Sequence, residues 1–416
     1  MTPPPPFPHQ PHHGPPTPPH STSHPLPIPA HPHRTTDIAA MAAPKQSILP
    51  LLKALSTARP DVTPDHITSA IALSFRDELS PAQTAALLTA LHFTGLDQQP
   101  AIIAAAATAM RDAGLRLPPL PTAVHGTHSA PGSYGGGLVD IVGTGGDGHN
   151  TFNVSTTSAI LASGCGLRIC KHGNKASTST SGSADILTSL GAHLSAVTPP
   201  VVADIFEGED ANFCFLFAPV YHPGMRHVAG IRRELGFRTI FNLLGPLVNP
   251  VDYSVPGGLE ARIIGVGRRE LGAVFAETLK LLGCRKGMVV CGEEGLDEVS
   301  CERRTECWRL VEEGAQRGRL RDVAGGKSAK ENAVILSRLL TGRGVESDRP
   351  VKEFILMNTA ALLVVAGAVG EVERVPEGAV ARGGVWKRAV EIAEEAMIDG
   401  SAWEEWCSFV EVSSEG

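Results

Sequence analysis

The stretch LVDIVGTGGDGHNTFNVST, residues 138–156, decides the fold. It begins with an apolar run typical of a strand, continues through four glycines within six positions, and ends where a helix is expected to begin. Glycine loses much conformational entropy on folding, so this density indicates a tight turn whose backbone N–H groups approach an anion. Asn153, Ser155 and Thr156 then offer capping side chains at a helix N-terminus, where the helix dipole favours negative charge. The stretch predicts a strand–loop–helix phosphate cradle.

Three of these glycines also fit the G-x-G-x-x-G pattern of dinucleotide-binding folds, which is a weak signal alone. Such a site needs an acidic residue at the end of the second strand. Here the expected second strand, 167–170, leads into Lys171 and His172. Their charge is wrong for a contact with ribose hydroxyls and right for binding a further phosphate. Asp147 within the loop would repel phosphate directly, so it indicates a divalent metal or a sugar hydroxyl. A dinucleotide site is therefore the less favoured alternative.

Composition indicates a globular protein. The length of 416 residues suggests two or three domains, and 42% apolar residues can form a sizeable core. The net charge of -7 argues against a nucleic-acid or membrane-surface role. Eight scattered cysteines without C-x-x-C are typical of reduced thiols, which predicts a cytoplasmic protein. The longest apolar run, near 360–369, is too short to span a bilayer.

The first 33 positions contain fourteen prolines and seven histidines. Such a composition cannot bury enough surface to fold, so we expect a disordered tail over residues 1–44. It lacks both the apolar core of a signal peptide and the arginines of a transit peptide. Translation starts either at Met1 or at Met41, where the helical pattern begins.

Residues 45–114 are expected to form a small all-helical domain. Thr63 and Ser80 each precede a proline, which is the pattern of an N-cap followed by proline in the first helical position. Asp97 is expected to cap a fourth, alanine-rich helix, and we expect no chemistry in this domain alone. Residues 115–137 are rich in Pro, Gly and Ser and are expected to be a linker or surface insertion.

From residue 138 to 416 the pattern alternates between strands and helices. We expect strands near 138–142, 167–170, 213–217, 261–266 and 286–291, and helices near 153–164, 181–190, 199–207, 225–235 and 269–282. This α/β alternation predicts a large domain with a mostly parallel central sheet flanked by helices. Ligands bind at the carboxyl ends of such strands, so the segments that follow them should converge on one crevice.

The segment KHGNKASTSTSGSADIL, residues 171–187, packs two lysines, a histidine, an asparagine and six hydroxyls into 13 residues before a helix. A hydroxyl-rich loop that enters a helix N-terminus can bind phosphate. The alternative is an ordinary polar loop, with Ser181 or Ser183 as the N-cap and Asp185 as a first-turn acid.

The segment YHPGMRHVAGIRRELGFRTIFNLLGPLVNP, residues 221–250, suits carboxylate recognition by arginine. Three arginines surround the expected helix end: Arg232, Arg233 and Arg238. For each of them singly, a surface or capping role is an equal alternative. His222 and His227 lack the spacing of a helical zinc pair, so no zinc site is expected.

The segment GLDEVS, residues 295–300, places Asp297 and Glu298 just past a strand end. Carboxylates suit Mg²⁺ shared with a phosphate, although adjacent acids are also common on surfaces. GGKS at 325–328 is not a phosphate loop of the Walker type, because Arg321 stands where that motif needs glycine.

Taken in order, these four motifs resemble the anthranilate phosphoribosyltransferase family over roughly residues 45–400, and the run from the arginines to LGPLVNP is the most specific. The resemblance implies a helical domain plus an α/β domain, a homodimer through the helical domain, and Mg²⁺ as cofactor. It implies transfer of 5-phosphoribosyl from phosphoribosyl pyrophosphate to the amine of anthranilate in tryptophan biosynthesis, with release of pyrophosphate.

The resemblance also implies roles for residues. Those implied for phosphoribosyl pyrophosphate are Gly143, Thr144, Gly145, Gly146, Asp147, Asn153, Ser155, Thr156, Lys171 and Ser183. Those implied for anthranilate are His172, Asn174, His222, Arg232 and Pro246. Ser155 would bind one Mg²⁺, and Asp297 with Glu298 the other. Lys175 and Thr180 depart from the family pattern, in which arginine and lysine are frequent at these positions.

The chemistry agrees with these residues. Cleavage of a C1–pyrophosphate bond leaves negative charge on the leaving group, which backbone N–H groups, Lys171 and Mg²⁺ can stabilise, with Asp147 beside the sugar. An aromatic amine needs no strong base, and His172 is the only nearby candidate. Two alternatives remain, a pyrimidine-nucleoside phosphorylase of similar architecture and a non-enzymatic relative that binds nucleic acid.

Overall fold

The computed structural model describes residues 45–57, 61–118, 120, 133–149, 151–176, 180–208, 211–254, 257–310, 318–319, 328–369 and 384–415. The tail predicted over 1–44, most of the insertion expected within 115–137, and most of GGKS lie outside the described residues. Within the described ranges, no helix combines the length and apolar character that crossing a bilayer requires.

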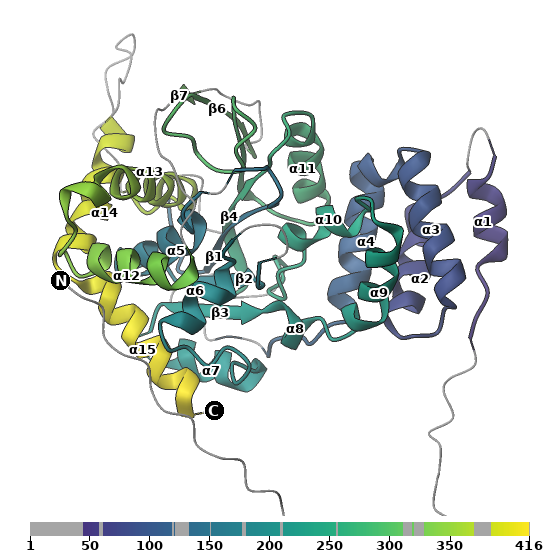
Figure 1. Ribbon diagram of the computed structural model, residues 1–416, viewed down its shortest axis with the longest axis horizontal. Coiled ribbons are helices and arrows are strands. Elements are labelled where there is room, and N and C mark those ends of the chain that lie inside the picture. The colour runs from purple at the N-terminus through teal and green to yellow at the C-terminus, as the bar shows by residue number, and fades with distance from the viewer. Residues whose placement is uncertain are drawn as a thin grey trace, which may run out of the picture. The chain divides into compact units, whose positions relative to one another are not determined.

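The N-terminal part is a helical bundle. Its helices are α1 (Leu49–Leu55), α2 (Pro64–Phe75), α3 (Pro81–Phe93) and α4 (Pro100–Asp112). The predicted N-caps are confirmed, because the Thr63 hydroxyl accepts from the His66 backbone N–H and the Ser80 hydroxyl from that of Gln83. α9 (Met225–Leu235) packs against α2 and α3, although more than a hundred residues separate them in sequence (Figure 1).

The expected capping role of Asp97 is wrong. Asp97 lies in a short 3₁₀ turn, Leu96–Gln98, and α4 begins after Gln99 without a side-chain cap. The Asp97 carboxylate is buried and bonds His92 Nδ1 at 2.9 Å. An aspartate before a helix can either cap that helix or bond another side chain, and Asp97 bonds His92.

The second part is built on a seven-stranded sheet in the order β3-β2-β1-β4-β5-β6-β7. The strands are β1 (Leu138–Gly143), β2 (Ile169–Gly173), β3 (Phe213–Phe217), β4 (Leu259–Gly265), β5 (Lys286–Gly292), β6 (Arg304–Arg309) and β7 (Gly318–Arg319). β1 to β5 pair in parallel, which confirms the predicted α/β class, whereas β6 and β7 add an antiparallel edge that the sequence did not predict. β2 begins two residues later and ends three residues later than expected, and because of its later end it includes Lys171 and His172.

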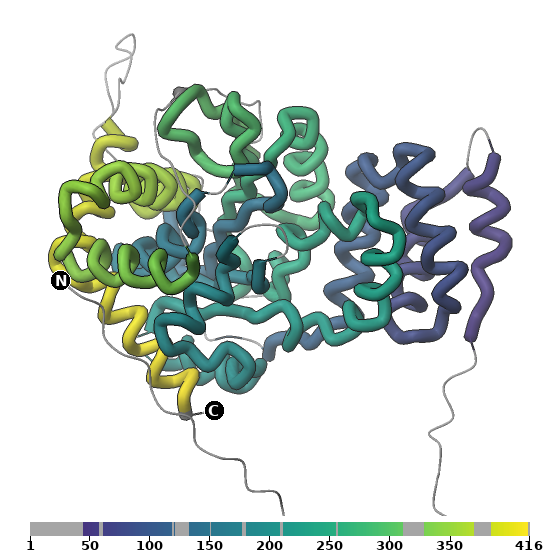
Figure 2. Tube along the Cα trace, in the orientation of Figure 1, coloured from purple at the N-terminus to yellow at the C-terminus, as the bar shows by residue number. Residues whose placement is uncertain are grey.

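Helices cover both faces of the sheet (Figure 1). Around α5 (Val154–Gly164) lie α13 (Arg349–Ala366), α14 (Gly384–Ile398) and α15 (Ser401–Glu415), and their buried side chains form one apolar core with the sheet. α11 (Glu270–Leu281) packs on α4, so the other core joins the sheet to the helical bundle. α15, at the yellow C-terminal end of the tube in Figure 2, contacts α5.

The remaining helices are short or peripheral. They are α6 (Ser183–Ser189), α7 (Pro199–Glu207), α8 (Ala218–Tyr221), α10 (Phe241–Leu244), η2 (Gly245–Leu247), α12 (Ala329–Leu340) and η3 (Glu346–Asp348). α6, α8 and α10 connect directly to segments that follow strands or α9. They therefore bring polar loops to the carboxyl edge of the parallel strands.

Candidate active site

A cavity of about 740 Å³ lies where the carboxyl ends of β1, β2 and β3 face α9 and the helical bundle. Every site residue predicted from the sequence lines it, with the exception of Lys171. The glycine loop, the segment after β2, the His222 segment and the acidic pair therefore converge as expected. Parallel strands end at one edge, which is why segments distant in sequence meet there.

The glycine loop needs its glycines for two different reasons. Gly145, Gly146 and Gly148 have φ of 67°, 68° and 83°, in the left-handed region that other residues rarely adopt. At Gly143 a Cβ atom would lie 2.5 Å from Asp297 Oδ2. The Gly145 backbone N–H donates to that same carboxylate at 2.6 Å. Asp297 and the glycine loop thus form one packed unit.

The predicted capping of α5 by its first polar side chains is not observed. Asn153 occupies the N-cap position, but its side chain makes no cap bond. Instead its amide donates to the Ser181 carbonyl at 3.0 Å, and its Oδ1 accepts from the Ser181 hydroxyl at 3.0 Å and from Asn332 Nδ2 at 3.1 Å. Asn153 therefore joins the two loops that would hold phosphates.

α6 begins at Ser183, and its N-cap is Gly182 rather than either serine. The Asp185 carboxylate accepts from the backbone N–H groups of Gly182 at 3.0 Å and Ala176 at 2.8 Å. This first-turn acid, proposed as part of the ordinary-loop alternative, fastens the hydroxyl-rich loop to the start of α6. Ser183 keeps its side chain at the cavity wall.

Three carboxylates gather beside the glycine loop. The Asp297 backbone N–H lies 3.4 Å from Asp147 Oδ2. Burial, and next the Asp147 carboxylate, raise the pKa of Asp297 to about 7. Burial and then Asp297 raise the pKa of Glu298, and Lys171 offsets this only partly. A site that raises carboxyl pKa values in this way disfavours the bare anions and favours a cation among them.

These carboxylates fit Mg²⁺. The Oε2 atom of Glu298 is enclosed and has no hydrogen-bond partner among the residues that the structure describes. Among the described residues, no three His, Cys, Asp or Glu side chains are arranged as a complete metal site. Mg²⁺ keeps several waters and takes phosphate oxygens, so a site with only one or two protein carboxylates suits it.

Lys171 is placed differently from the prediction. Its side chain is 1% exposed, and Nζ donates to the Ile141 carbonyl at 2.5 Å and lies 3.4 Å from Ser155 Oγ. Burial lowers the pKa of Lys171 to about 8, although Asp140 and Glu298 raise it. Lys171 therefore lies behind Ser155, and any influence on a ligand passes through that hydroxyl and the electrostatic field.

His172 and His222 form the floor of the other half of the cavity. Their rings are 5.1 Å apart and edge-on, and His222 Nε2 bonds the Val248 carbonyl at 2.8 Å. Burial lowers the pKa of His222 to about 4 and, together with His222, lowers the pKa of His172. Both rings are therefore neutral near pH 7, and in the described part of the chain the enclosed His172 Nε2 has no hydrogen-bond partner.

Arg232 lies on α9 with its guanidinium 5.6 Å from the centre of the Phe241 ring. Burial lowers its pKa, and within the described residues no carboxylate forms an ion pair with it. A half-buried guanidinium that lines a cavity without an anion is a suitable receptor for a ligand carboxylate. Arg233 is exposed, so of these two neighbours only Arg232 faces the cavity.

Two further residues reach the site: Arg238, from the predicted arginine cluster, and Met110, from the helical domain. Arg238 Nη1 donates to the Gly146 carbonyl at 3.3 Å and so reaches the glycine loop from the segment after α9. Met110 lines the cavity from α4, so the helical domain, in which alone no chemistry is expected, forms part of the cavity wall. The sequence signal for Arg238 was its place in the cluster of arginines at the helix end. No sequence signal distinguished Met110 within its alanine-rich helix.

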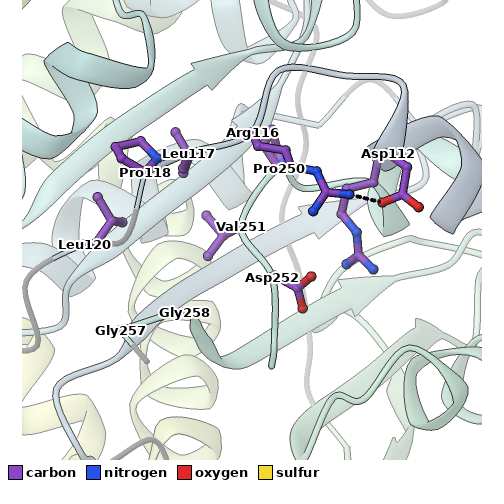
Figure 3. Close-up of a pocket in the computed structure, with 11 residues that line it drawn as sticks. Asp112, Arg116, Leu117, Pro118, Leu120, Pro250, Val251, Asp252, Gly257 and Gly258 are labelled. Atoms are coloured by element: carbon purple, nitrogen blue, oxygen red, sulfur yellow. Dashed lines mark hydrogen bonds and ion pairs between the residues drawn. The ribbon is translucent and has the colours of Figure 1, made fainter. Parts of the chain in front are cut away.

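A second, much smaller cavity of about 100 Å³ lies between the end of α4 and the segment 250–252 (Figure 3). Arg116 on its rim pairs with Asp112 at 2.9 Å. The cavity mixes both signs of charge and is too small for a phosphorylated sugar.

Comparisons with known proteins agree along the chain. Residues 135–403 match the family model described as "Glycosyl transferase family, a/b domain", and residues 49–114 match "Glycosyl transferase family, helical bundle domain". The chain is 40% identical to the anthranilate phosphoribosyltransferase of Schizosaccharomyces pombe, over 86% of this chain and 94% of that protein. It is 36% identical to the enzyme of that name from Herpetosiphon aurantiacus, over 81% and 96%.

Solved structures give the same result. The anthranilate phosphoribosyltransferase from Saccharomyces cerevisiae in complex with PRPP and Mg superposes with a TM-score of 0.74 at 33% identity, covering 88% of this chain and 98% of that one. The anthranilate phosphoribosyltransferase from Thermus thermophilus superposes with a TM-score of 0.71 at 34% identity, over 88% and 99%.

Proposed function

Because this chain belongs to the anthranilate phosphoribosyltransferases, we propose that its cavity transfers 5-phosphoribosyl from phosphoribosyl pyrophosphate to the amine of anthranilate and releases pyrophosphate. This reaction belongs to tryptophan biosynthesis. The observation that carries the proposal is that the glycine loop and the acidic residues share one cavity with Arg232, which forms no ion pair within the described ranges. One half suits a pyrophosphate and its cation, and the other suits an aromatic carboxylate.

The donor half supports departure of the pyrophosphate. We assign the donor to the glycine loop, Asn153, Ser155, Thr156 and Ser183, which all line the cavity. Asp297 and Glu298 would hold one Mg²⁺ and Ser155 another, and these ions supply positive charge that stabilises the leaving group. The helix N-terminus of α5 favours negative charge at the same place.

The acceptor half supports orientation of the amine. We assign the anthranilate carboxylate to Arg232, and the aromatic ring to the wall formed by His172, Asn174, His222 and Pro246. Holding the amine behind C1 converts a bimolecular encounter into an oriented one. Neutral His172, whose Nε2 meets no hydrogen-bond partner among the described residues, can accept the proton lost by the amine only as a weak base, because burial lowers its pKa.

The experiment follows the fluorescence of anthranilate with phosphoribosyl pyrophosphate and Mg²⁺. We expect anthranilate consumption matched by pyrophosphate release, and no phosphorolysis of pyrimidine nucleosides under the same conditions. Absence of consumption, or phosphorolysis in its place, would contradict the assignment.

We also propose that the enzyme is a cytoplasmic homodimer joined through the helical bundle. All eight cysteines lie in described positions and none forms a disulfide, as expected in a reducing compartment. In the bundle, Leu49 on α1 and Phe93 on α3 are 54% and 77% exposed. A second copy would cover these apolar side chains.

A further inference from the structure

We infer that Asp140, Arg262 and Asn249 form a buried positioning unit that fixes the acceptor loop, residues 245–251, and thereby sets anthranilate affinity without touching the substrate. The inference rests on the proposed function, because that function places anthranilate against this loop. In the part of the chain that the structure describes, none of the three side chains lines the cavity.

A buried ion pair is the centre of this unit. Asp140 on β1 and Arg262 on β4 are partners in register on neighbouring parallel strands. Arg262 Nη2 donates to Asp140 Oδ2 at 2.5 Å, and the two side chains are 1% and 0% exposed. The same Nη2 donates to the Pro246 carbonyl at 2.6 Å, while Nη1 donates to the Tyr253 hydroxyl at 2.8 Å. One guanidinium thus holds the chain at the start of the acceptor loop and just beyond its end.

Asn249 fastens the middle of the acceptor loop to two strands. Its Nδ2 donates to Asp140 Oδ2 at 3.0 Å and to the Cys170 carbonyl at 2.9 Å, and its Oδ1 accepts from the Val251 N–H at 3.0 Å. Cys170 directly precedes Lys171 in β2. The unit therefore ties the acceptor loop to the two strands that carry the glycine loop and Lys171.

The opposite side of the acceptor loop faces the substrate. Gly245, Pro246 and Val248 line the cavity, and the Val248 carbonyl is bonded by His222. The positioning unit thus holds the acceptor loop on the side of the sheet, and His222 holds it on the side of the cavity. A shift of the unit would move this wall as a whole.

Stability alone does not account for the ion pair. Apolar side chains of similar volume often replace a buried ion pair without loss of stability. What they cannot supply is the planar fork by which arginine donates to several acceptors in fixed directions. Arg262 uses that fork on a loop carbonyl, a tyrosine and a carboxylate, which indicates that its role is to set the position of the loop.

The test removes both members of the ion pair together, so that neither is left without the other, and their opposite effects on the pKa of Lys171 are removed together. For Asp140→Leu/Arg262→Met we expect the anthranilate KM to rise about ten-fold or more, since a displacement of ~1 Å can cost ~100-fold. The KM for phosphoribosyl pyrophosphate should change less than about two-fold, a small difference on the affinity scale. The matched control is Glu260→Leu/Lys286→Met, a pair at 2.5 Å that links β4 to β5 away from the cavity.

An equal rise in both KM values, or the same anthranilate-specific rise in the control, would overturn the inference. If the double variant does not fold, Arg262→Lys keeps the charge but loses the fork, and we expect the same anthranilate-specific rise with a Tm near that of the wild type. An unchanged anthranilate KM in that variant would also overturn it.

Fluorescence titration of anthranilate without turnover separates this inference from the proposed function. Failure of the wild type to consume anthranilate contradicts the proposed function. Equal anthranilate Kd values for wild type and Arg262→Lys contradict the positioning role, whatever the turnover.

Discussion

At the scale of single residues, the two halves of the cavity are separable by mutation. If Arg232 binds the anthranilate carboxylate, Arg232→Ala should raise the anthranilate KM about ten- to a hundred-fold, since a charge-assisted hydrogen bond contributes ~1.5–3 kcal/mol. The KM for phosphoribosyl pyrophosphate should barely change, and exposed Arg233→Ala is the control. Steady-state kinetics with each substrate varied decide the matter. Equal loss of donor binding, or a lower Tm with unaltered kinetics, would assign Arg232 to its helix instead.

Lys171 should give the reverse pattern. Its ammonium lies behind Ser155 on the donor side, so Lys171→Met should raise the donor KM and leave the anthranilate KM near that of the wild type. The loss of one hydrogen bond to a charged group corresponds to about ten-fold or more. The same kinetic experiment measures it. An anthranilate-specific defect would contradict this placement.

The raised pKa of Asp297 predicts how the stability of the metal-free enzyme depends on pH. Burial and the Asp147 carboxylate raise its pKa to about 7, whereas an aspartate in an unfolded chain has a pKa of about 3.9. Between these two values the folded state binds more protons than the unfolded state. This contribution to the free energy of unfolding therefore decreases as pH rises through that window. With EDTA, stability should fall from pH 5.5 to 8. Mg²⁺, which binds the deprotonated carboxylate, should stabilise the protein more at pH 8 and restore the activity that EDTA abolishes.

Thermal melts at the two pH values, with EDTA and with Mg²⁺, measure this effect. Asp297→Asn is the control, because it removes one of the two carboxyl groups with a raised pKa and should reduce the difference. Equal stabilisation by Mg²⁺ at both pH values, or full turnover in metal-free buffer, would refute a metal site at Asp297.

At the scale of elements, the glycine loop should tolerate no Cβ atom at Gly143, whose Cβ would lie 2.5 Å from Asp297 Oδ2. Gly143→Ala should therefore displace this carboxylate, raise the Mg²⁺ concentration needed for half-maximal activity and lower kcat. A matched glycine is Gly230 in α9, where a Cβ would meet nothing within 4 Å. Gly230→Ala should add ~0.5–1 kcal/mol of stability through helix propensity and leave kinetics unchanged. Mg²⁺ titrations and melts compare them, and unaltered Mg²⁺ dependence in Gly143→Ala would contradict the contact.

The regular elements were largely predictable, whereas side-chain partners were not. α7, α9 and β3 have the predicted bounds because proline, glycine and apolar runs mark them locally. β6, with the sequence RTECWR, escaped prediction because its charged residues do not resemble a buried strand. The position of Lys171 depends on a carbonyl 30 residues away, and that of Asp297 on an N–H 152 residues away. Such long-range contacts follow from the sheet order, which local patterns do not contain.

At the scale of the whole molecule, we expect the N-terminal segment 1–44 to be dispensable for folding. The two described apolar cores are built from residues 48–409. Deletion of residues 1–44 should therefore leave Tm and kcat/KM nearly unchanged, since the composition of that segment cannot support a core. Comparison of the truncated and full chains by melting and kinetics tests this. A large drop in Tm would show that the tail packs on the enzyme.

Association should depend on the exposed apolar side chains of the bundle. Phe93 on α3 is 77% exposed and sits beside the rings of His92 and Phe237, so it offers a preformed aromatic surface. Phe93→Glu would bury a charge at an interface there, and we expect it to shift sedimentation from dimer to monomer at micromolar protein, because truncating a central aromatic contact can cost ~2 kcal/mol or more. Leu281→Glu is the matched control, because Leu281 is 53% exposed on α11, outside the bundle.

A wild-type monomer at that concentration would contradict the proposed dimer. Equal dissociation by both variants would place the interface elsewhere than the bundle, while a dimer that only Phe93→Glu dissociates would assign it to α3.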